Sequence, residues 1–200
     1  MIKIYGNRRS RATRCMWLLE EIGTPYELIP IDPANGDNRT PGYLALNPSG
    51  KMPVLEADGV VMSESHAINL WLAQRAGGEF WPDDAWTKGR ILQWTLWTGA
   101  ELEPVTTGIL RAKRAGGADA DGRIAELQEA AKVLIGLVEI QLKDAPFLAG
   151  EAFSVADVSV GSVVAFFAFF GIDLGPFPQT SSWFARLQSR PAYQRVFASA

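Results

Sequence analysis

The strand-like segments of this sequence all lie within its first 62 residues, and the chain after residue 84 has helical spacing. Alternating apolar residues are typical of strands, whereas apolar residues three and four apart are typical of helices. The early segments follow the order β-α-β-α-β-β-α, which predicts a small α/β unit. We expect strands at 2–5, 26–31, 53–56 and 60–62 and helices at 10–22, 42–46 and 65–76.

A segment with two glycines and a proline, GGEFWPDD, separates this unit from an all-helical one. We predict a first domain at 1–77, a linker at 78–84 and a second domain at 85–200. Pro104 lies inside the first long helix and should bend it, because a proline interrupts the hydrogen-bond ladder. Helices are expected at 85–115, 123–144, 154–170, 180–190 and 191–198.

Several short signals mark where elements begin and end. Ser10 is a candidate N-cap and Gly23 a candidate stop for the first helix. Pro30 predicts an edge strand, because proline donates no ladder hydrogen bond. Asp58-Gly59 between two strands predicts a tight hairpin.

The second domain has one specific helix signal, Ser154-Val-Ala-Asp157. It has the form of a capping box, with Ser154 as N-cap and Asp157 three residues later, and Phe153 and Val158 form the matching hydrophobic staple. The motif predicts the start of the most apolar helix, and its structural explanation is complete without a functional role.

Composition excludes several classes of protein. A net charge of −3 gives no reason to expect nucleic acid as a partner. Cys15 is the single cysteine, which excludes an internal disulfide and a cysteine-based metal cluster and fits a cytoplasmic protein without a metal. The N-terminal sequence MIKIYGNRRS has no apolar region typical of a secretory signal. The most apolar run, 158–170, is too short to span a membrane and is expected to be a buried helix.

The most informative stretch is NPSGKMPVLEADGVVMSESHAI at 47–68. If the Met52–Pro53 bond is cis, the chain turns there and the backbone N–H and C=O of Met52 point into solvent. An extended peptide could then pair with them as an added strand. The alternative is that Pro53 simply begins an edge strand.

Glu64 and Ser65 lie where a strand ends and a helix begins. The free N–H groups of a helix start, together with the Ser65 hydroxyl, form an anion site, and Glu64 could take an ammonium group. An α-amino acid carries both charges on one carbon, so the pair matches such a head group. Capping alone would explain Ser65 but makes less use of Glu64.

Ser10 is the third candidate, at the entrance of the first helix in NRRSRATR. Its hydroxyl and nearby N–H groups could stabilise an anion, and Arg9 and Arg11 add positive potential. The alternative is a plain N-cap.

Taken together, these segments resemble a cytosolic glutathione S-transferase of the serine type. The resemblance rests on SRATRCMWLLEEIGTPYE, NPSGKMPVLEADG, ESHAI, FLAGEAFSVADVS and SSWFARLQSRPAYQRVF, and it covers essentially the whole chain. It implies a thioredoxin-like N-terminal domain, an α-helical C-terminal domain, and a homodimer with one glutathione site in each subunit.

The resemblance also implies roles for individual residues. Ser65 and Glu64 match the residues that hold the γ-glutamyl head of glutathione. Met52, before Pro53, matches the residue whose backbone pairs with the cysteinyl part. Lys51 matches a position that often reaches the glycyl carboxylate.

Ser10 matches the catalytic serine, although a shift of a few residues would put Asn7 or Arg9 there instead. The sequence departs from the tyrosine-type classes, since Tyr5 lies in a strand. It also departs from the cysteine-type classes, since Cys15 is more than a turn into the helix and is expected to be buried and inert.

A hydroxyl that donates to the glutathione sulfur would be sufficient to activate it in a partly desolvated site. The thiol has a reference pKa of about 8.5, and a hydrogen bond to an anion contributes about 1.5–3 kcal/mol, which lowers the pKa by roughly one to two units. No general base is then required, and we interpret His66 as a surface or packing residue. The pocket for a small hydrophobic electrophile could be lined by Trp94, Trp97, Glu101 and Arg111. The same residues could equally be core or dimer contacts.

The main hypothesis is therefore an enzyme that joins glutathione to an electrophile or reduces a peroxide with it. The alternative is a non-catalytic binding or regulatory protein of the same fold, against which the retained Lys51, Pro53, Glu64 and Ser65 argue. A thiol-disulfide oxidoreductase is disfavoured, because the sequence has no C-x-x-C motif.

Overall fold

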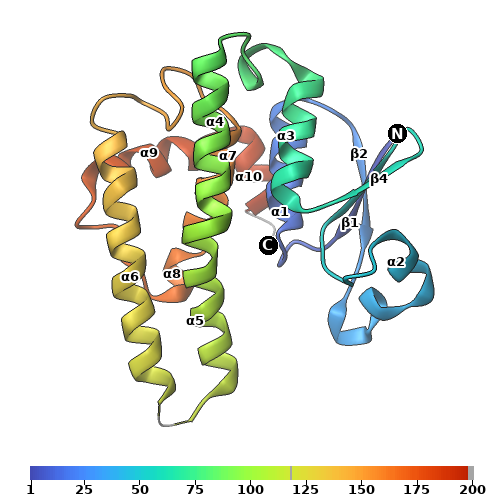
Figure 1. Ribbon diagram of the computed structural model, residues 1–200, viewed down its shortest axis with the longest axis horizontal. Coiled ribbons are helices and arrows are strands. Elements are labelled where there is room, and N and C mark those ends of the chain that lie inside the picture. Colours follow the sequence, from blue (N-terminus) through green and yellow to red (C-terminus); the bar gives the residue numbers. More distant parts are fainter. Residues whose placement is uncertain (118, 198–200) are drawn as a thin grey trace. The chain divides into compact units, whose positions relative to one another are not determined.

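The computed structural model describes residues 1–117 and 119–197, which fall into two compact units (Figure 1). The first unit contains residues 1–81 and the described residues from 189 onward, and the second contains 82–188.

The first unit is built on a four-stranded sheet with the strand order β2-β1-β3-β4. β1 pairs in parallel with β2, while β3 runs antiparallel to both β1 and β4. Helices α1 and α3 lie against one face of the sheet and α2 lies on the other side (Figure 1). The predicted thioredoxin-like fold is confirmed. Its elements are β1 (Ile2–Gly6), α1 (Ala12–Glu21), β2 (Tyr26–Pro30), α2 (Pro41–Leu46), β3 (Val54–Ala57), β4 (Val60–Ser63) and α3 (Ser65–Ala76), with short 3-10 helices at Pro33–Asn35, Asp37–Arg39 and Gly78–Phe80.

The turn signals in this unit act largely as predicted. Asp58 and Gly59 both have positive φ, 53° and 77°, as a tight hairpin turn between right-twisted strands requires. Pro30 ends β2, which is an edge strand. Gly23 follows the end of α1 with φ at 65°. The expected N-cap role of Ser10 is wrong, because α1 begins only at Ala12 and Arg11 occupies the cap position.

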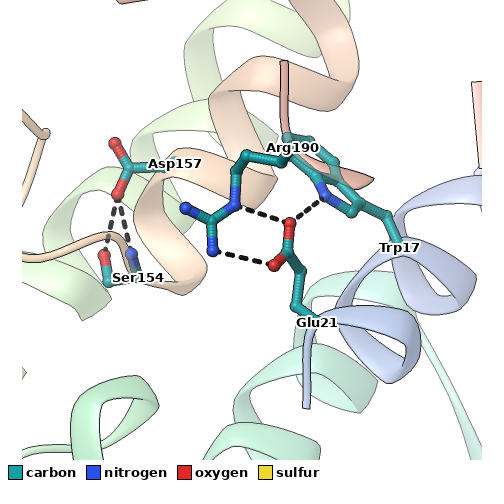
Figure 2. A network of polar contacts seen from close by, with 5 residues as sticks. All are labelled: Trp17, Glu21, Ser154, Asp157 and Arg190. Atoms are coloured by element: carbon teal, nitrogen blue, oxygen red, sulfur yellow. Dashed lines mark hydrogen bonds and ion pairs between the residues drawn. The ribbon is translucent and has the colours of Figure 1, made fainter. Parts of the chain in front are cut away.

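The last helix, α10 (Pro191–Phe197), packs on α1 within the first unit. Trp17 of α1 contacts Tyr193 and Phe197 edge to face, with ring centroids 5.1 and 5.7 Å away. Arg190 also holds Glu21 through two hydrogen bonds of 2.7 and 2.8 Å, and Trp17 donates to the same carboxylate (Figure 2). We expected the residues after 188 to belong to the helical domain; the described ones contact α1 instead.

The second unit is all helical, as predicted, with α5 and α6 as its long neighbouring pair (Figure 1). The helix expected at 85–115 is interrupted by a π-helical segment just before Pro104, and the one expected at 154–170 is broken after Val164. Pro104 explains the first interruption, because proline has no backbone N–H for the α-helical ladder; nothing in the local sequence explains the second. The elements are α4 (Ala85–Trp97), a π-helix (Thr98–Leu102), α5 (Glu103–Ala115), α6 (Ala120–Gln141), α7 (Val155–Val164), α8 (Phe167–Phe170) and α9 (Pro178–Gln188).

The start of α7 confirms the predicted capping box. Ser154 Oγ accepts a hydrogen bond from Ala156 N–H at 3.2 Å, and the Asp157 carboxylate accepts from Ser154 N–H at 2.9 Å (Figure 2). Asp157 also accepts from Leu148 N–H at 3.0 Å and from the Trp183 indole at 2.9 Å. Complete burial raises the pKa of Asp157, although these hydrogen bonds counteract the shift. The staple residues Phe153 and Val158 are both buried.

Candidate functional site

Met52 lies just before the sheet begins to pair. Its bond to Pro53 is cis, as the sequence hypothesis required. The ladder between β1 and β3 starts at the pair Tyr5 and Val54, two residues after Met52. Pro53 is buried and Met52 is half-buried, so the backbone of Met52 stands at the end of the ladder.

The loop that leads to Met52 is held by its own polar side chains. The carbonyl of Lys51 accepts hydrogen bonds from the Tyr43 hydroxyl and the Asn47 amide, each at 2.8 Å. Burial raises the pKa of Tyr43 to about 12, which keeps it a neutral donor. The backbone of Lys51 is therefore fixed, while its side chain is exposed.

A second cation lies beside this loop that the sequence did not single out. The Arg39 guanidinium is 3.5 Å from the Ser49 carbonyl, and the Asn38 amide donates to the Gly50 carbonyl at 2.7 Å. A Cβ on Gly50 would lie 2.7 Å from Arg39 Nη1 and 2.9 Å from the backbone carbonyl oxygen of Asn38, and the φ of Gly50 is 64°, so glycine is strongly favoured there. The sequence around Arg39 does not predict this contact, because Arg39 and Gly50 are brought together only by the fold.

Glu64 has an unusual backbone conformation at the start of α3. Its φ is 69° and its ψ is 105°, and its side chain makes no capping hydrogen bond. Such a conformation in a non-glycine residue costs about 1–3 kcal/mol and is found most often at functional positions. Glu64 is exposed, whereas Ser65 is only 4% exposed. The N–H groups of the first turn of α3 therefore begin beside an exposed carboxylate.

The turn between β1 and α1 brings Ser10 close to Met52. A Cβ on Gly6 would lie 3.4 Å from Ser10 Oγ and 3.9 Å from Met52 Cβ. The Ser10 hydroxyl donates to the Asn7 carbonyl at 2.8 Å and accepts from Ala12 N–H at 3.2 Å. The Asn7 amide nitrogen donates to the Ile31 carbonyl at 2.7 Å and lies 4.0 Å from Met52 Sδ. Arg9, the other alternative, is exposed.

Tyr5 could activate a nucleophile and Cys15 could act as one, but the structure makes both side chains unsuited to these roles. The Tyr5 hydroxyl donates to Glu56 at 2.6 Å, and this hydrogen bond together with burial raises the pKa of Tyr5 to about 12. Cys15 is fully buried, as expected, and burial raises the pKa of its thiol to about 12. A thiol with this pKa is almost entirely protonated at neutral pH.

The remaining predicted residues lie elsewhere. His66 is half-buried, with Nε2 2.7 Å from Arg14 Nη1. In the second unit Trp97 is half-buried, with its ring 5.1 Å from that of buried Trp94, and Arg111 is exposed on α5. A surface pocket of about 450 Å³ in the first unit is lined by Asp58, Trp71, Gln74 and Arg75, none of which was predicted.

Residues 1–117 and 119–197 contain no group of three or more His, Cys, Asp and Glu side chains arranged to hold a metal ion. No helix in these ranges combines the length and the hydropathy needed to cross a bilayer.

Comparison with known proteins shows the family to which the chain belongs. The N-terminal domain of glutathione S-transferases matches residues 1–74, and the C-terminal domain matches 115–191. A probable glutathione S-transferase, GSTF2, of Oryza sativa subsp. japonica is 30% identical over 208 residues, covering 98% of this chain and 95% of the relative. The chain therefore belongs to the glutathione S-transferase family.

Two further relatives differ in what their names state. A theta class glutathione S-transferase from Xanthomonas axonopodis pv. citri, solved with glutathione bound, has a TM-score of 0.90 and 31% identity over 100% of this chain and 98% of its own. The disulfide-bond oxidoreductase YfcG of Escherichia coli is 29% identical and covers 96% of this chain and 92% of its own length. The chain is similar to proteins named for two different reactions, so its own reaction has to be inferred from its own residues.

Proposed function

We propose that the protein is a glutathione transferase that activates the thiol of glutathione for attack on an electrophile or a peroxide. The observation that carries this proposal is the start of α3, where exposed Glu64 stands beside the first-turn N–H groups and the Ser65 hydroxyl. That arrangement offers one anionic and one anion-binding group at neighbouring residues, as the amino-acid head of glutathione requires.

The rest of the tripeptide follows the open end of the sheet. In this proposal the cysteinyl part pairs with the backbone of Met52 beside Pro53. The glycyl carboxylate lies near Lys51, and Arg39 supplies a second positive charge next to Gly50. Charge-assisted hydrogen bonds at both ends would fix the direction of the peptide.

Ser10 is our candidate for stabilising the thiolate. Its proton is donated to the Asn7 carbonyl in the structure, a bond with a net value of about 0.5–1.5 kcal/mol. Turning the proton to a sulfur anion exchanges this bond for one worth about 1.5–3 kcal/mol. The exchange is favourable, and it lowers the pKa of the bound thiol. Asn7 and Arg9 are the alternatives in the same turn.

The second substrate is assigned to the helical domain, which follows a glutathione domain at 1–77 and a linker at 78–84 and ends at 188, where the chain returns to the first unit. Trp97 and Arg111 are its candidate lining residues, for a small hydrophobic electrophile. We also propose a cytoplasmic homodimer with no nucleic acid or membrane partner. A sedimentation profile with monomer alone would contradict the dimer.

Binding and turnover with the full chain test the proposal. We expect retention on glutathione-agarose and conjugation of a generic aryl halide, 1-chloro-2,4-dinitrobenzene. Ser10→Ala should lower kcat about 10- to 100-fold with little change in glutathione affinity, since one hydrogen bond to the anion is lost. Asn7→Ala and Arg9→Ala are the matched controls, and the larger loss identifies the group that faces the sulfur.

The possible outcomes separate the candidate functions. Retention without turnover of an aryl halide or a peroxide supports the non-catalytic binding protein instead. Failure to bind glutathione at all contradicts both. Equal activity of Ser10→Ala and the unmodified chain shows that Ser10 has been given the wrong role.

A further inference from the structure

Arg8 links the turn that carries Ser10 to the last helix, α10. Arg8 Nη1 donates to the backbone carbonyl of Val196 at 2.9 Å and lies 3.4 Å from the carbonyl of Arg195. Val196 lies 188 positions further along the chain, but both segments belong to the first unit. The contact therefore joins two ends of the chain within one compact unit.

The two carbonyls that Arg8 meets lie in the last turn of α10, which ends at Phe197. The last four carbonyls of an α-helix have no N–H partner inside the helix. The same end of a helix carries the negative pole of its dipole, which favours a cation. Arg8 is half-buried and supplies both a donor and a positive charge, so it matches this helix end in hydrogen bonding and in charge.

Asn7 holds the same turn to the end of β2. Its amide donates to the Ile31 carbonyl at 2.7 Å. The Asn7 carbonyl accepts from the Ser10 hydroxyl at 2.8 Å and from Ser10 N–H at 3.2 Å. Arg9 N–H donates to Asn7 Oδ1 at 3.0 Å. Because Arg8 lies between Asn7 and Ser10, the turn is held at two places, at β2 through Asn7 and at α10 through Arg8.

Holding the turn at two places limits where the Ser10 hydroxyl can point. A hydrogen bond weakens steeply as its angle departs from linearity, so a donor is effective only if its own position is fixed. We propose that Arg8 is a positioning residue: by anchoring the β1–α1 turn on the C-terminal end of α10, it holds the Ser10 hydroxyl where it can donate to the sulfur of glutathione. The inference rests on the proposed function, and it makes thiol activation depend on α10.

The alternative is that Arg8 only caps α10. A cap contributes to the stability of the fold but has no effect on the sulfur. The pKa of the bound thiol separates the two roles, because a thiolate absorbs in the ultraviolet where the thiol does not. The titration uses the full chain saturated with glutathione, and urea denaturation of the same variants measures the contribution of the cap.

Arg8→Met should raise the pKa of the bound thiol by about 0.5 to 1, and should lower kcat about three- to tenfold below that pKa, because the thiolate fraction falls. The KM for glutathione should change less than about twofold, since the groups proposed to bind the peptide are untouched. Arg8→Lys, which keeps a charged donor, should restore most of both values.

The matched control is Arg195→Met. It removes the ion pair of 2.6 Å between Arg195 and Glu20, which also joins α10 to α1, and it keeps the backbone carbonyl near Arg8. The pKa of the bound thiol should stay unchanged. An equal rise in both variants would show a general effect of α10 packing and would overturn the specific role of Arg8.

Combining Arg8→Met with Ser10→Ala tests whether Arg8 acts through Ser10. Once the hydroxyl is absent, Arg8→Met should change the pKa of the bound thiol no further, because interacting residues are not additive. A full additional rise in the double variant overturns the positioning role.

The remaining outcomes separate this role from the proposed function. If Arg8→Met does not fold, Arg8→Gln replaces it, since the amide carries no charge, and the pKa must still rise. An unchanged pKa in a folded variant overturns the role of Arg8 and leaves the proposed function intact. An unmodified chain whose bound thiol keeps its reference pKa of about 8.5 overturns both.

Discussion

The starts of α3 and α7 show two different uses of a serine beside a helix N-terminus. At α7 the Ser154 hydroxyl and the Asp157 carboxylate satisfy the donors of the helix start, and both residues are buried. At α3 the Ser65 hydroxyl accepts from Arg14, and Glu64 makes no capping bond and is exposed. The first arrangement closes the helix start, and the second leaves its donors available.

This comparison shows how a helix start that can bind a ligand is distinguished from one that is only capped. Every helix start has unsatisfied N–H groups, so the presence of serine alone says little. What matters is whether a carboxylate of the protein already accepts from them. The start of α9 is closed in the same sense, because Glu139 of α6 accepts from Gln179 N–H at 3.0 Å and Thr180 N–H at 2.8 Å.

The largest effect is expected at the closed start of α7. Asp157→Ala should lower the free energy of unfolding by about 3–5 kcal/mol, because it leaves several buried donors without an acceptor. Urea denaturation followed by circular dichroism measures the change. A loss below about 1 kcal/mol would mean that the capping network contributes little to the stability of the second unit.

Serine substitutions at the two helix starts should have opposite signatures. Ser65→Ala should weaken glutathione binding about 10- to 100-fold, the value of a hydrogen bond to a charged group, with little change in stability. Ser154→Ala, the matched control, should lower the free energy of unfolding by about 1 kcal/mol without affecting glutathione affinity. Calorimetric titration and urea denaturation of both variants make the comparison. Unchanged affinity in Ser65→Ala would show that the start of α3 does not bind the head group.

The smallest effect concerns the start of α9 and its pH dependence. Burial by itself would raise the pKa of Glu139, but the hydrogen bonds from Gln179 and Thr180 outweigh it and hold the pKa below its usual 4.5. Because the folded state lowers this pKa, the stabilisation is present above about pH 4.5 and is lost as the pH falls through the folded value. Glu139→Gln should therefore cost about 0.5–2 kcal/mol at pH 7 and less at acid pH.

Urea denaturation of both chains between pH 3 and pH 7 measures the difference directly. The gap between the unmodified chain and Glu139→Gln should narrow as the pH is lowered. A gap that stays constant over this range would show that the carboxylate charge is not what caps α9.

Features governed by local chemistry could be predicted from the sequence. The Asp58-Gly59 turn needs positive φ at both residues, and the Ser154–Asp157 spacing defines a capping box, so both follow from short segments. The order of strands and helices in the first unit follows from periodicity, and the second unit was expected to be helical from the absence of strand signals.

Features that depend on contacts between distant segments could not be predicted. The contact of Arg14 with Ser65 joins residues 51 positions apart, and that of Arg39 with Gly50 depends on the fold of a polar loop. The later start of α1 has a local cause instead: the Ser10 hydroxyl bonds to Asn7 within the preceding turn, and a serine at this position looks the same in the sequence whether it caps the helix or closes the turn before it. The packing of α10 on α1 could not be predicted from the amphipathic pattern of α10, because such a pattern does not specify the partner helix.

A crystal structure of the protein with glutathione tests the central claim most directly. We expect the γ-glutamyl carboxylate within hydrogen-bond distance of Ser65 Oγ, the cysteinyl backbone paired with Met52, and the sulfur beside the turn that contains Ser10. A tripeptide bound elsewhere, or its ammonium group at Ser65 in place of the carboxylate, would contradict the account.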